Sequence, residues 1–459
     1  MADMDSQATL GSRIRAALRT QPAAPPIEDD AEMRRVYRTW RIRSMYGMLV
    51  GYAAFYLVRK NLSIAMPAML EDLNYTKTDF GILLSAFSVL YGVGKLTNGI
   101  IADRANPRYF IAIGLLGAAF FNVAFGLSTS ITFLGIFWLG NAWMQSMGWP
   151  PCARLLTFWY SPRERGTMWG IWNASHQIGG ALILVGGGFL VTRFGWRSAF
   201  YVPAVVSALL ALFVMHRLRD TPQSLGLPPV EVYRGERTEM APETTTYTWK
   251  EILFGHVLTN RNIWFVCIAN LFVYIVRIGM LDWAPTFLVE YKGSSLEMAG
   301  WKTAVFELAG IAGALSAGLL SDRIFRGRRG PASVIYMLVL IVAIVLFWRL
   351  PAGRPWLDTA LLFVIGFAVY GPQMLVGVAA ADFASKGAAA TATGLTGTFG
   401  YIGSAICGVG TGVIVDRWGW DGGFAFYLAA AVIGTFFFTL TWSAQAAGQS
   451  EEAAPEQGP

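Results

Sequence analysis

The chain has 459 residues, of which 54% are hydrophobic and only 14% charged, and its mean hydropathy is +0.46. Soluble proteins carry roughly 25% charged residues, so this composition excludes a soluble enzyme and a disordered, collagenous or disulfide-stapled chain. We attribute the net charge of +7 to basic loops of a membrane protein rather than to nucleic-acid binding. The three cysteines lie in apolar stretches without the spacing of metal ligands, so neither a metal nor a cofactor is expected.

Twelve apolar segments follow one another along the chain, and a membrane-spanning helix needs about 20 apolar residues. They lie near residues 44–68, 80–102, 108–128, 131–158, 167–191, 198–215, 262–289, 299–320, 332–350, 357–381, 388–415 and 422–443. The sequence therefore predicts an all-α integral membrane protein with 12 transmembrane helices. The expected domains are an N-terminal tail (1–41), a six-helix bundle (42–216), a central loop (217–260), a second six-helix bundle (261–443) and a C-terminal tail (444–459).

The loops indicate the orientation of the chain. Counted near the helix ends, one side holds about 18 Lys and Arg residues and the other about 8. Basic loops mark the cytoplasmic side, so both termini and the central loop are expected to be cytoplasmic. Residues 1–41 lack the short apolar core of a cleavable signal peptide. The polar stretches 1–33 and 444–459 are expected to be mobile.

Three short motifs recur in the same order at an offset of about 220 residues, which indicates an internal duplication. They are Tyr56-Leu-Val-Arg59 with Tyr274-Ile-Val-Arg277, Gly99-Ile-Ile-Ala-Asp103-Arg104 with Gly318-Leu-Leu-Ser-Asp322-Arg323, and Phe194-Gly-Trp with Trp418-Gly-Trp. Because six helices per half is an even number, both halves enter the membrane in the same orientation. This predicts two parallel repeats around a central cavity and resembles the major facilitator fold.

A few charged residues remain inside the predicted helices. The clearly intramembrane acids are Asp282 and Glu307. The basic residues are Arg59, Lys60, Lys95, Arg154 and Arg277. A basic residue at mid-helix costs roughly 2.5–3.5 kcal/mol, so such residues normally face a partner or a substrate. The surplus of positive charge predicts an anion that binds and leaves.

Arg59 and Arg277 occupy equivalent places in the two repeats. Their planar forks of donors suit a phosphate, and a dianionic phosphoryl group can use both forks. The alternative is that one or both arginines pair with Asp282 or Glu307. For Arg154, near the cytoplasmic end of its helix, we favour pairing with a carboxylate or snorkelling to the interface.

The segment Arg165-Gly-Thr-Met-Trp-Gly-Ile-Trp172-Asn173-Ala-Ser-His176-Gln177-Ile-Gly179-Gly180 resembles the helix-5 signature of the organophosphate:phosphate antiporters of the major facilitator superfamily. The only departure is Gln177, where the family has Asn. Within that family the stretches 56–61 and 148–152 most resemble the glycerol-3-phosphate branch. Thr393 and Thr396 replace an Asp and a Lys of the hexose-phosphate transporters, whereas the stretch 371–375 is similar to the hexose-phosphate sensor.

The resemblance implies the residues of the site. Those expected to bind substrate are Arg59, Arg277, His176, Lys60, Lys95, Tyr52, Tyr56, Asn173, Tyr274 and Tyr370. Asp282 and Glu307 are expected to be gating charges that change partners between states. Asp103 and Asp322, which end the repeated loop motif, are expected to lock helix ends in one state.

The resulting hypothesis is a secondary transporter of a bacterial inner membrane. It exchanges an external organophosphate, best glycerol-3-phosphate, for internal inorganic phosphate by alternating access. The alternatives are a hexose-phosphate transporter, a hexose-phosphate sensor signalling to a membrane kinase, and a carboxylate facilitator. Gly92-Val-Gly-Lys95 fails the phosphate-loop pattern and no catalytic constellation occurs, so we expect no enzyme and no nucleotide site. The other expected partners are inorganic phosphate and the lipid bilayer but no nucleic acid, and a monomer is the default.

Overall fold

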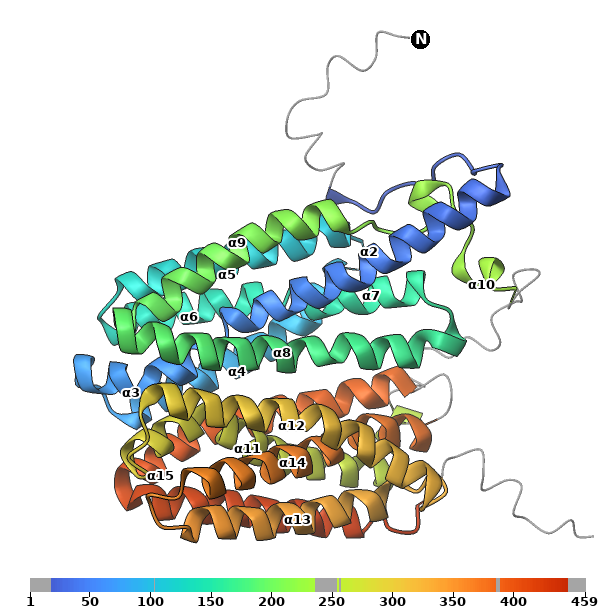
Figure 1. The fold of residues 1–459 in the computed structure, drawn as a ribbon. Helices are drawn as coiled ribbons and strands as arrows, with labels where there is room; N and C mark the ends of the chain where they lie inside the picture. The colour runs from blue at the N-terminus through green and yellow to red at the C-terminus, as the bar shows by residue number, and fades with distance from the viewer. Residues whose placement is uncertain (1–17, 103, 236–253, 256, 385–388, 445–459) are drawn as a thin grey trace, which may run out of the picture. The chain divides into compact units, whose positions relative to one another are not determined.

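The computed structural model describes residues 18–102, 104–235, 254–255, 257–384 and 389–444. Their regular structure is helical except for one isolated β-bridge between Arg19 and Ala105 (Figure 1). Among these described residues, nine helices are long and apolar enough to cross a membrane. The predicted all-α membrane architecture is confirmed.

The first six predicted segments coincide with helices in chain order. Segments 44–68 and 131–158 are each split into two helices. The elements are α2 (Asp30–Leu57), α3 (Asn61–Leu73), α4 (Lys77–Ala102), α5 (Pro107–Leu127), α6 (Ile131–Gln145), α7 (Trp149–Trp159), α8 (Pro162–Phe194) and α9 (Ser198–Arg217). The central loop contains the short helices η1 (Gln223–Leu225) and α10 (Val230–Tyr233).

The other six predicted segments are helical as well. The elements are α11 (Arg261–Glu290), α12 (Leu296–Arg323), α13 (Arg329–Arg349), α14 (Pro355–Phe383) and α15 (Ala389–Thr439). α15 contains the last two segments, and Gly419 separates them with a backbone of φ 67° and ψ −172°. A positive φ is easily adopted only by glycine, so the chain turns there between two helices.

The break between α2 and α3 is stabilised by amide side chains. In lipid the backbone carbonyls freed by a helix break need internal donors. Asn122 of α5 and Asn141 of α6 both donate to the carbonyl oxygen of Val58 at 3.0 Å. Gln145 of α6 donates to the carbonyl of Phe55 at 2.9 Å. These three amides make a non-helical segment tolerable at this depth.

The chain forms two compact units. Unit 1 comprises residues 1–59, 90–180 and 200–242, and unit 2 comprises residues 60–89, 181–199 and 243–459. In unit 1, α2 lies beside α5 and α9 (Figure 1). Two glycines of α2 allow this approach, because a Cβ at Gly47 would meet Leu218 and one at Gly51 would meet Val214, each at 2.8 Å.

In unit 2, α4 packs closely on α15. A Cβ at Gly81 would lie 2.5 Å from the carbonyl oxygen of Gly408, and small residues let helix backbones approach in this way. Ser88 and Ser404 share a hydrogen bond of 2.8 Å. At the start of α4, Asp416 accepts hydrogen bonds from the backbone N–H of Thr78 at 2.7 Å and from its hydroxyl at 2.6 Å. This carboxylate of α15 therefore caps the N-terminus of α4.

Residues 18–29, which precede α2, form hydrogen bonds with other parts of unit 1. The carbonyl of Leu18 accepts a hydrogen bond of 2.8 Å from Asn106 N–H. Gln21 N–H donates to the Asp220 carboxylate at 2.9 Å. The prediction that all of residues 1–33 are mobile was therefore wrong for residues 18–33. The polar composition of residues 18–33 did not reveal that their backbone forms hydrogen bonds with the central loop.

Candidate functional site

Arg59 lies at the break between α2 and α3, against two tyrosine rings. Its guanidinium carbon is 5.4 Å from the ring centre of Tyr56 and 4.2 Å from that of Tyr91. Such cation–π contacts stabilise a desolvated guanidinium. Sequence reasoning missed Tyr91, although it lies one helical turn before Lys95 on α4 and so shares its face.

The helix-5 signature of α8 places its aromatic and histidine side chains on α2. A Cβ at Gly179 would lie 2.5 Å from the carbonyl oxygen of Ala53, so glycine is needed for α8 to approach α2. The ring centres of Tyr56 and His176 are 5.6 Å apart, and those of Tyr52 and Trp172 are 4.8 Å apart. These four side chains are buried. The predicted face of α8 is therefore packed on the helix that precedes Arg59.

Two further predicted site residues of unit 1 lie at the edge of this group. Asn173, beside Trp172 on α8, is exposed. Lys95 of α4 holds its ammonium 4.0 Å from the ring centre of Trp149. Trp149 in turn lies 6.5 Å from Trp172, centre to centre. Lys95 is thus connected to the α8 signature through aromatic rings.

Arg277, the repeat partner of Arg59, is buried in the middle of α11. Its guanidinium donates to the Tyr370 hydroxyl at 3.1 Å, and that hydroxyl donates to the Glu307 carboxylate at 2.6 Å. Its guanidinium carbon lies 5.6 Å from the Tyr274 ring centre. Glu307 is fully buried. The phenol of Tyr370 therefore links the arginine to the acid.

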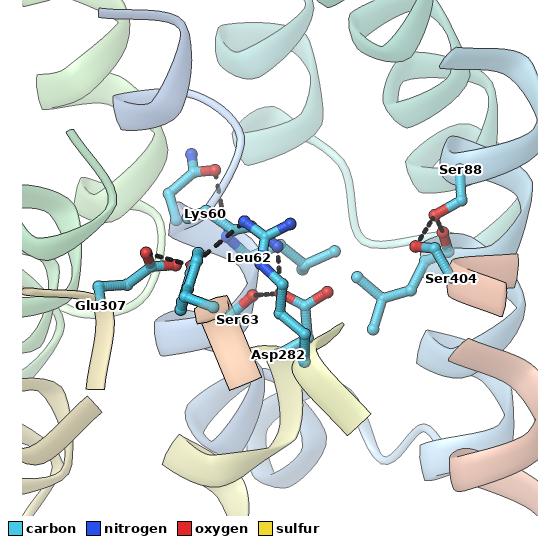
Figure 2. A network of polar contacts seen from close by, with 11 residues as sticks. Lys60, Leu62, Ser63, Ser88, Asp282, Glu307 and Ser404 are labelled. Carbon is cyan, nitrogen blue, oxygen red and sulfur yellow. Dashed lines mark hydrogen bonds and ion pairs between the residues drawn. The ribbon is translucent and has the colours of Figure 1, made fainter. Parts of the chain in front are cut away.

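Lys60, Ser63 and Asp282 form a second polar group of unit 2, and Figure 2 shows their side chains pointing toward one another. The Lys60 ammonium lies 2.6 Å from the Asp282 carboxylate, and the Ser63 hydroxyl donates to the same oxygen at 2.7 Å. Both charged side chains are buried, with relative exposures of 7% and 6%. Lys60 thus neutralises the charge of Asp282. The sequence had assigned this lysine to substrate binding.

The arrangement bears on the alternative pairings of the arginines. Asp282 bonds to Lys60 and Ser63, and Glu307 accepts from the phenol that Arg277 also contacts. The resemblance implied Arg277 and Tyr370 as substrate-binding residues and Glu307 as a gating charge, and the structure joins the three side chains by hydrogen bonds. Sequence reasoning missed the hydroxyl of Ser63, which lies one helical turn after Lys60.

The count of charges inside helices was incomplete. Lys302 of α12 and Asp358 of α14 are both 2% exposed and form an ion pair of 3.0 Å. Lys292, in the turn after α11, lies 3.6 Å from the same carboxylate and donates to the Phe347 carbonyl at 3.2 Å. Lys302 lies inside the predicted segment 299–320 and Lys292 just after the segment 262–289, but neither was counted among the intramembrane charges, because the sequence cannot show how far a segment end is buried.

The residues of the repeated loop motif have different positions. Asp103 lies outside the described residues. Asp322, which is 62% exposed, pairs with Arg329, and Arg329 also pairs with Asp382 at 3.0 Å. Asp322 is thus an ion-pair residue at a helix end, and its role in gating stays a prediction.

The expected pairing of Arg154 is confirmed. Its guanidinium lies 2.9 Å from the Asp220 carboxylate and donates to the carbonyls of Ala102 and Ala105 at 3.2 and 2.7 Å. Asp220 is fully buried. This arginine joins the end of α4 to the segment after α9.

Glu164, at the start of α8, is the centre of another ion-pair group. Arg41 of α2 donates to its carboxylate at 2.5 Å, and Arg234, which follows α10, binds the other oxygen. Burial acts to raise the pKa of Glu164, but the hydrogen bonds from the two arginines outweigh it and lower that pKa below its ordinary value. The carboxylate therefore stabilises this end of unit 1 in its charged form.

Among the residues that the structure describes, no group of three or more His, Cys, Asp and Glu side chains could hold a metal ion. The three cysteines are buried and free. The chemistry available near Arg59 and Arg277 is therefore that of guanidinium, ammonium, phenol, imidazole and carboxylate groups.

Apolar helices of membrane-spanning length that bury several charged side chains define a multi-pass membrane transport protein. The model of the Major Facilitator Superfamily matches residues 48–408. The chain belongs to this superfamily, and its relatives place it in the organophosphate:phosphate antiporter branch. It is accordingly not an enzyme.

Three relatives illustrate the branch. The chain is 44% identical over 430 residues to a probable hexose phosphate transport protein of Chlamydia pneumoniae, covering 91% of this chain and 94% of the relative. It is 43% identical over 433 residues to the glycerol-3-phosphate transporter of Bacillus subtilis, covering 92% and 97%. It is 38% identical over 430 residues to the membrane sensor protein UhpC of Escherichia coli, covering 93% and 98%.

A solved structure supports the fold. The inward-facing, unoccupied bacterial homologue of the human lysosomal transporter Spinster matches with a TM-score of 0.73 over 88% of this chain and 97% of that chain. The identity is 17%. This similarity confirms the predicted major facilitator fold.

Proposed function

We propose that this protein exchanges an external organophosphate, best glycerol-3-phosphate, for internal inorganic phosphate by alternating access. Arg59 and Arg277 each bind oxygens of the phosphoryl group. The observation that carries the proposal is the shared setting of the two repeat-related arginines. Each lies against two tyrosine rings, Tyr56 and Tyr91 for Arg59 and Tyr274 and Tyr370 for Arg277.

Charge supports an anionic substrate. The named residues include the cations Arg59, Lys60, Lys95 and Arg277 and the acids Asp282 and Glu307. Asp282 bonds to Lys60 within the structure. The formal surplus is positive, and guanidinium forks match phosphate oxygens better than any other side chain does. A carboxylate could use one fork, whereas a phosphoryl dianion can use two.

Exchange rather than uniport follows from the cost of desolvated charge. Closing the protein around cationic arginines without an anion leaves charge in a low-dielectric environment, which is unfavourable. Bound phosphate stabilises the closed state, so the protein changes conformation when it is loaded. His176, in contact with Tyr56, supplies a further hydrogen bond, and Tyr52, Asn173, Tyr274 and Lys95 complete the proposed substrate set.

The gating role is assigned to the polar groups that involve Asp282 and Glu307. Each acid binds a group that also belongs to the proposed substrate set, Lys60 for Asp282 and Tyr370 for Glu307. A phosphate that draws Lys60 or Tyr370 toward itself weakens one of these contacts. Substrate binding is thereby coupled to the change of state. Asp103 and Asp322 are proposed to fix helix ends in one of the two states.

A hexose-phosphate transporter is the second candidate. The similarity to the hexose-phosphate and glycerol-3-phosphate relatives is nearly equal, 44% and 43%. At the positions where hexose-phosphate transporters carry an Asp and a Lys, the hydroxyls of Thr393 and Thr396 bond to the carbonyls of Gly377 and Thr393. Uncharged side chains here favour the smaller substrate. The third candidate is a sensor that signals to a membrane kinase, by the likeness to UhpC.

We also propose the arrangement of the chain in its membrane. The protein lies in the inner membrane of a bacterium, with both termini and the 217–260 loop in the cytoplasm, by the excess of basic residues on that side. The two six-helix bundles are residues 42–216 and 261–443. One chain carries both repeats, so a monomer suffices for transport.

The test is exchange in vesicles that contain the purified protein and labelled inorganic phosphate. Glycerol-3-phosphate, glucose-6-phosphate or a dicarboxylate is added outside, and label efflux is followed. Efflux driven by glycerol-3-phosphate alone supports the proposal, and efflux driven by glucose-6-phosphate assigns the hexose-phosphate substrate. Binding of either phosphate without efflux would contradict transport and favour the sensor.

A further inference from the structure

Two arginines of unit 1, Arg43 of α2 and Arg219 just after α9, lie against the ring of Trp40, and a third, Arg108, lies at the start of α5. The guanidinium carbons of Arg219 and Arg43 lie 4.3 and 5.1 Å from the ring centre of Trp40. Arg108, the second residue of α5, lies 5.1 Å from the ring centre of Tyr109. None of these residues belongs to the proposed transport site.

The fold brings Arg43 and Arg219 together at Trp40. α2 and α9 approach at Gly47, where a Cβ would lie 2.8 Å from Leu218. This contact places Arg219, next to Leu218, beside the turn of α2 that carries Trp40 and Arg43. The positive end of the α5 dipole adds to the charge of Arg108. The cluster is thus made by helix packing and not by a flexible tail.

The cluster carries a surplus of positive charge. Within the described part of the chain, Arg43, Arg108 and Arg219 form no ion pair. The neighbouring acid Asp220 is bound by Arg154 and by Gln21 N–H. Burial lowers the pKa of the Arg219 guanidinium, and the charges of Arg108 and Arg43 lower it further.

One donor of the cluster points to a ligand. The Nε atom of Arg108 is buried and makes no hydrogen bond with any described residue. A buried guanidinium donor normally has a partner. Arg219 donates to the carbonyls of His216 and Leu218, so its side chain is held in place by its own helix end. The group is therefore pre-positioned for an anion.

The surface beside the cluster is apolar. On α5, Ile113, Leu116 and Phe120 are 42%, 41% and 64% exposed. On α9, Leu209 and Leu212 are 61% and 56% exposed. In a membrane protein such faces contact acyl chains. Trp40 and Tyr109 are the side chains typical of the interface between acyl chains and water.

We propose that Arg43, Arg108 and Arg219 bind the phosphate of one anionic phospholipid whose acyl chains lie along α5 and α9. Basic groups between membrane helices are suited to such headgroups. The planar forks of three arginines can surround one phosphodiester. A free phosphate ion shares the charge, but it would gain nothing from the adjoining apolar faces.

The test compares lipid binding by the full-length protein and two variants in phosphatidylcholine nanodiscs with increasing phosphatidylglycerol. Thermal unfolding and native mass spectrometry report the bound lipid. Arg108→Gln with Arg219→Gln should weaken the phosphatidylglycerol response by about thirtyfold, since each basic residue near an anionic headgroup contributes about fivefold. The control is Arg349→Gln, because Arg349 also lies 4.3 Å over a tryptophan ring, that of Trp348, but belongs to the other unit.

We expect the control variant to keep the lipid response of the unchanged protein. If the double variant fails to fold, Arg43→Gln alone should give a smaller loss, of about fivefold, in the same assay. Equal responses of the arginine variants and the control would overturn the proposal. A second result would also overturn it. If the arginine variants lose the response to inorganic phosphate added in pure phosphatidylcholine but keep the response to phosphatidylglycerol, the cluster binds a free anion.

Discussion

The hydroxyl of Tyr370 connects the arginine and the acid of unit 2, so its removal is the sharpest perturbation of that group. Tyr370→Phe keeps the buried ring and deletes one oxygen atom. Two hydrogen bonds are lost, the one from Arg277 at 3.1 Å and the one to Glu307 at 2.6 Å. If Tyr370 positions Arg277 for phosphate, the variant should fold and bind phosphate weakly.

The magnitude follows from the charges of the two partners. Hydrogen bonds to charged groups contribute about 1.5–3 kcal/mol each. Loss of the bond to Arg277 should therefore weaken the apparent affinity for phosphate by roughly ten- to a hundredfold. The bond to Glu307 affects stability instead, because a carboxylate that is fully buried loses a donor.

The assay is exchange of labelled phosphate over a range of external phosphate concentrations, together with thermal unfolding. The matched control is Tyr336→Phe, in the same unit. Tyr336 is 6% exposed, and its hydroxyl shares a 2.7 Å hydrogen bond with the neutral Ser316. The control should keep the phosphate affinity. Equal affinity losses in both variants, or none in Tyr370→Phe, would refute a positioning role for Tyr370.

The other predictions concern stability. Lys60→Met leaves the buried Asp282 carboxylate without its cation and should lower the unfolding free energy by about 3–5 kcal/mol. The double variant Lys60→Met with Asp282→Leu should regain most of that stability. Additive losses in the two variants would contradict the pairing. Glu164 has a lowered pKa, so its stabilisation is present above its ordinary pKa of 4.5 and is lost as the pH falls through the folded value. The melting temperature of the unchanged protein should therefore fall more steeply below about pH 4.5 than that of Glu164→Gln, and parallel curves would speak against this. Gly412→Ala should lower the melting temperature, because its Cβ would overlap the Lys77 carbonyl. Gly410→Ala should leave the melting temperature unchanged, because the nearest neighbour of its Cβ would be 3.5 Å away. Similar effects of the two variants would argue against close packing of α4 and α15.

The sequence predicts the helical fold well because lipid imposes a simple rule. Every backbone polar group must bond internally, so long apolar segments become helices. The rule does not reveal where a helix breaks. The interruption before Arg59 depends on Asn122, Asn141 and Gln145, which come from other helices. Its repeat partner Arg277 lies in the unbroken helix α11, so the duplication alone suggests more symmetry than the two repeats have.

Candidate site residues can be predicted from the sequence where the residue type itself determines the role. They are harder to predict where the role depends on which partner the side chain contacts. The arginines and His176 are found from charge, repeat and signature. Lys60 and Lys302 show the limit of this reasoning, since each is paired with an acid far along the chain. The assignment of such a lysine to substrate or to an ion pair requires tertiary contacts. The aromatic neighbour Tyr91 could have been found from its spacing to Lys95.

The most direct test of the transport account is glycerol-3-phosphate-driven efflux of labelled phosphate by Arg277→Ala. Arg349→Ala, at the exposed end of α13, serves as the control for loss of an arginine. Membrane insertion of both variants is checked by their yield in the purified vesicles. The account predicts that Arg277→Ala is inserted but shows no exchange, while the control exchanges as the unchanged protein does. Full exchange by Arg277→Ala would contradict the central claim that this arginine binds the phosphoryl group.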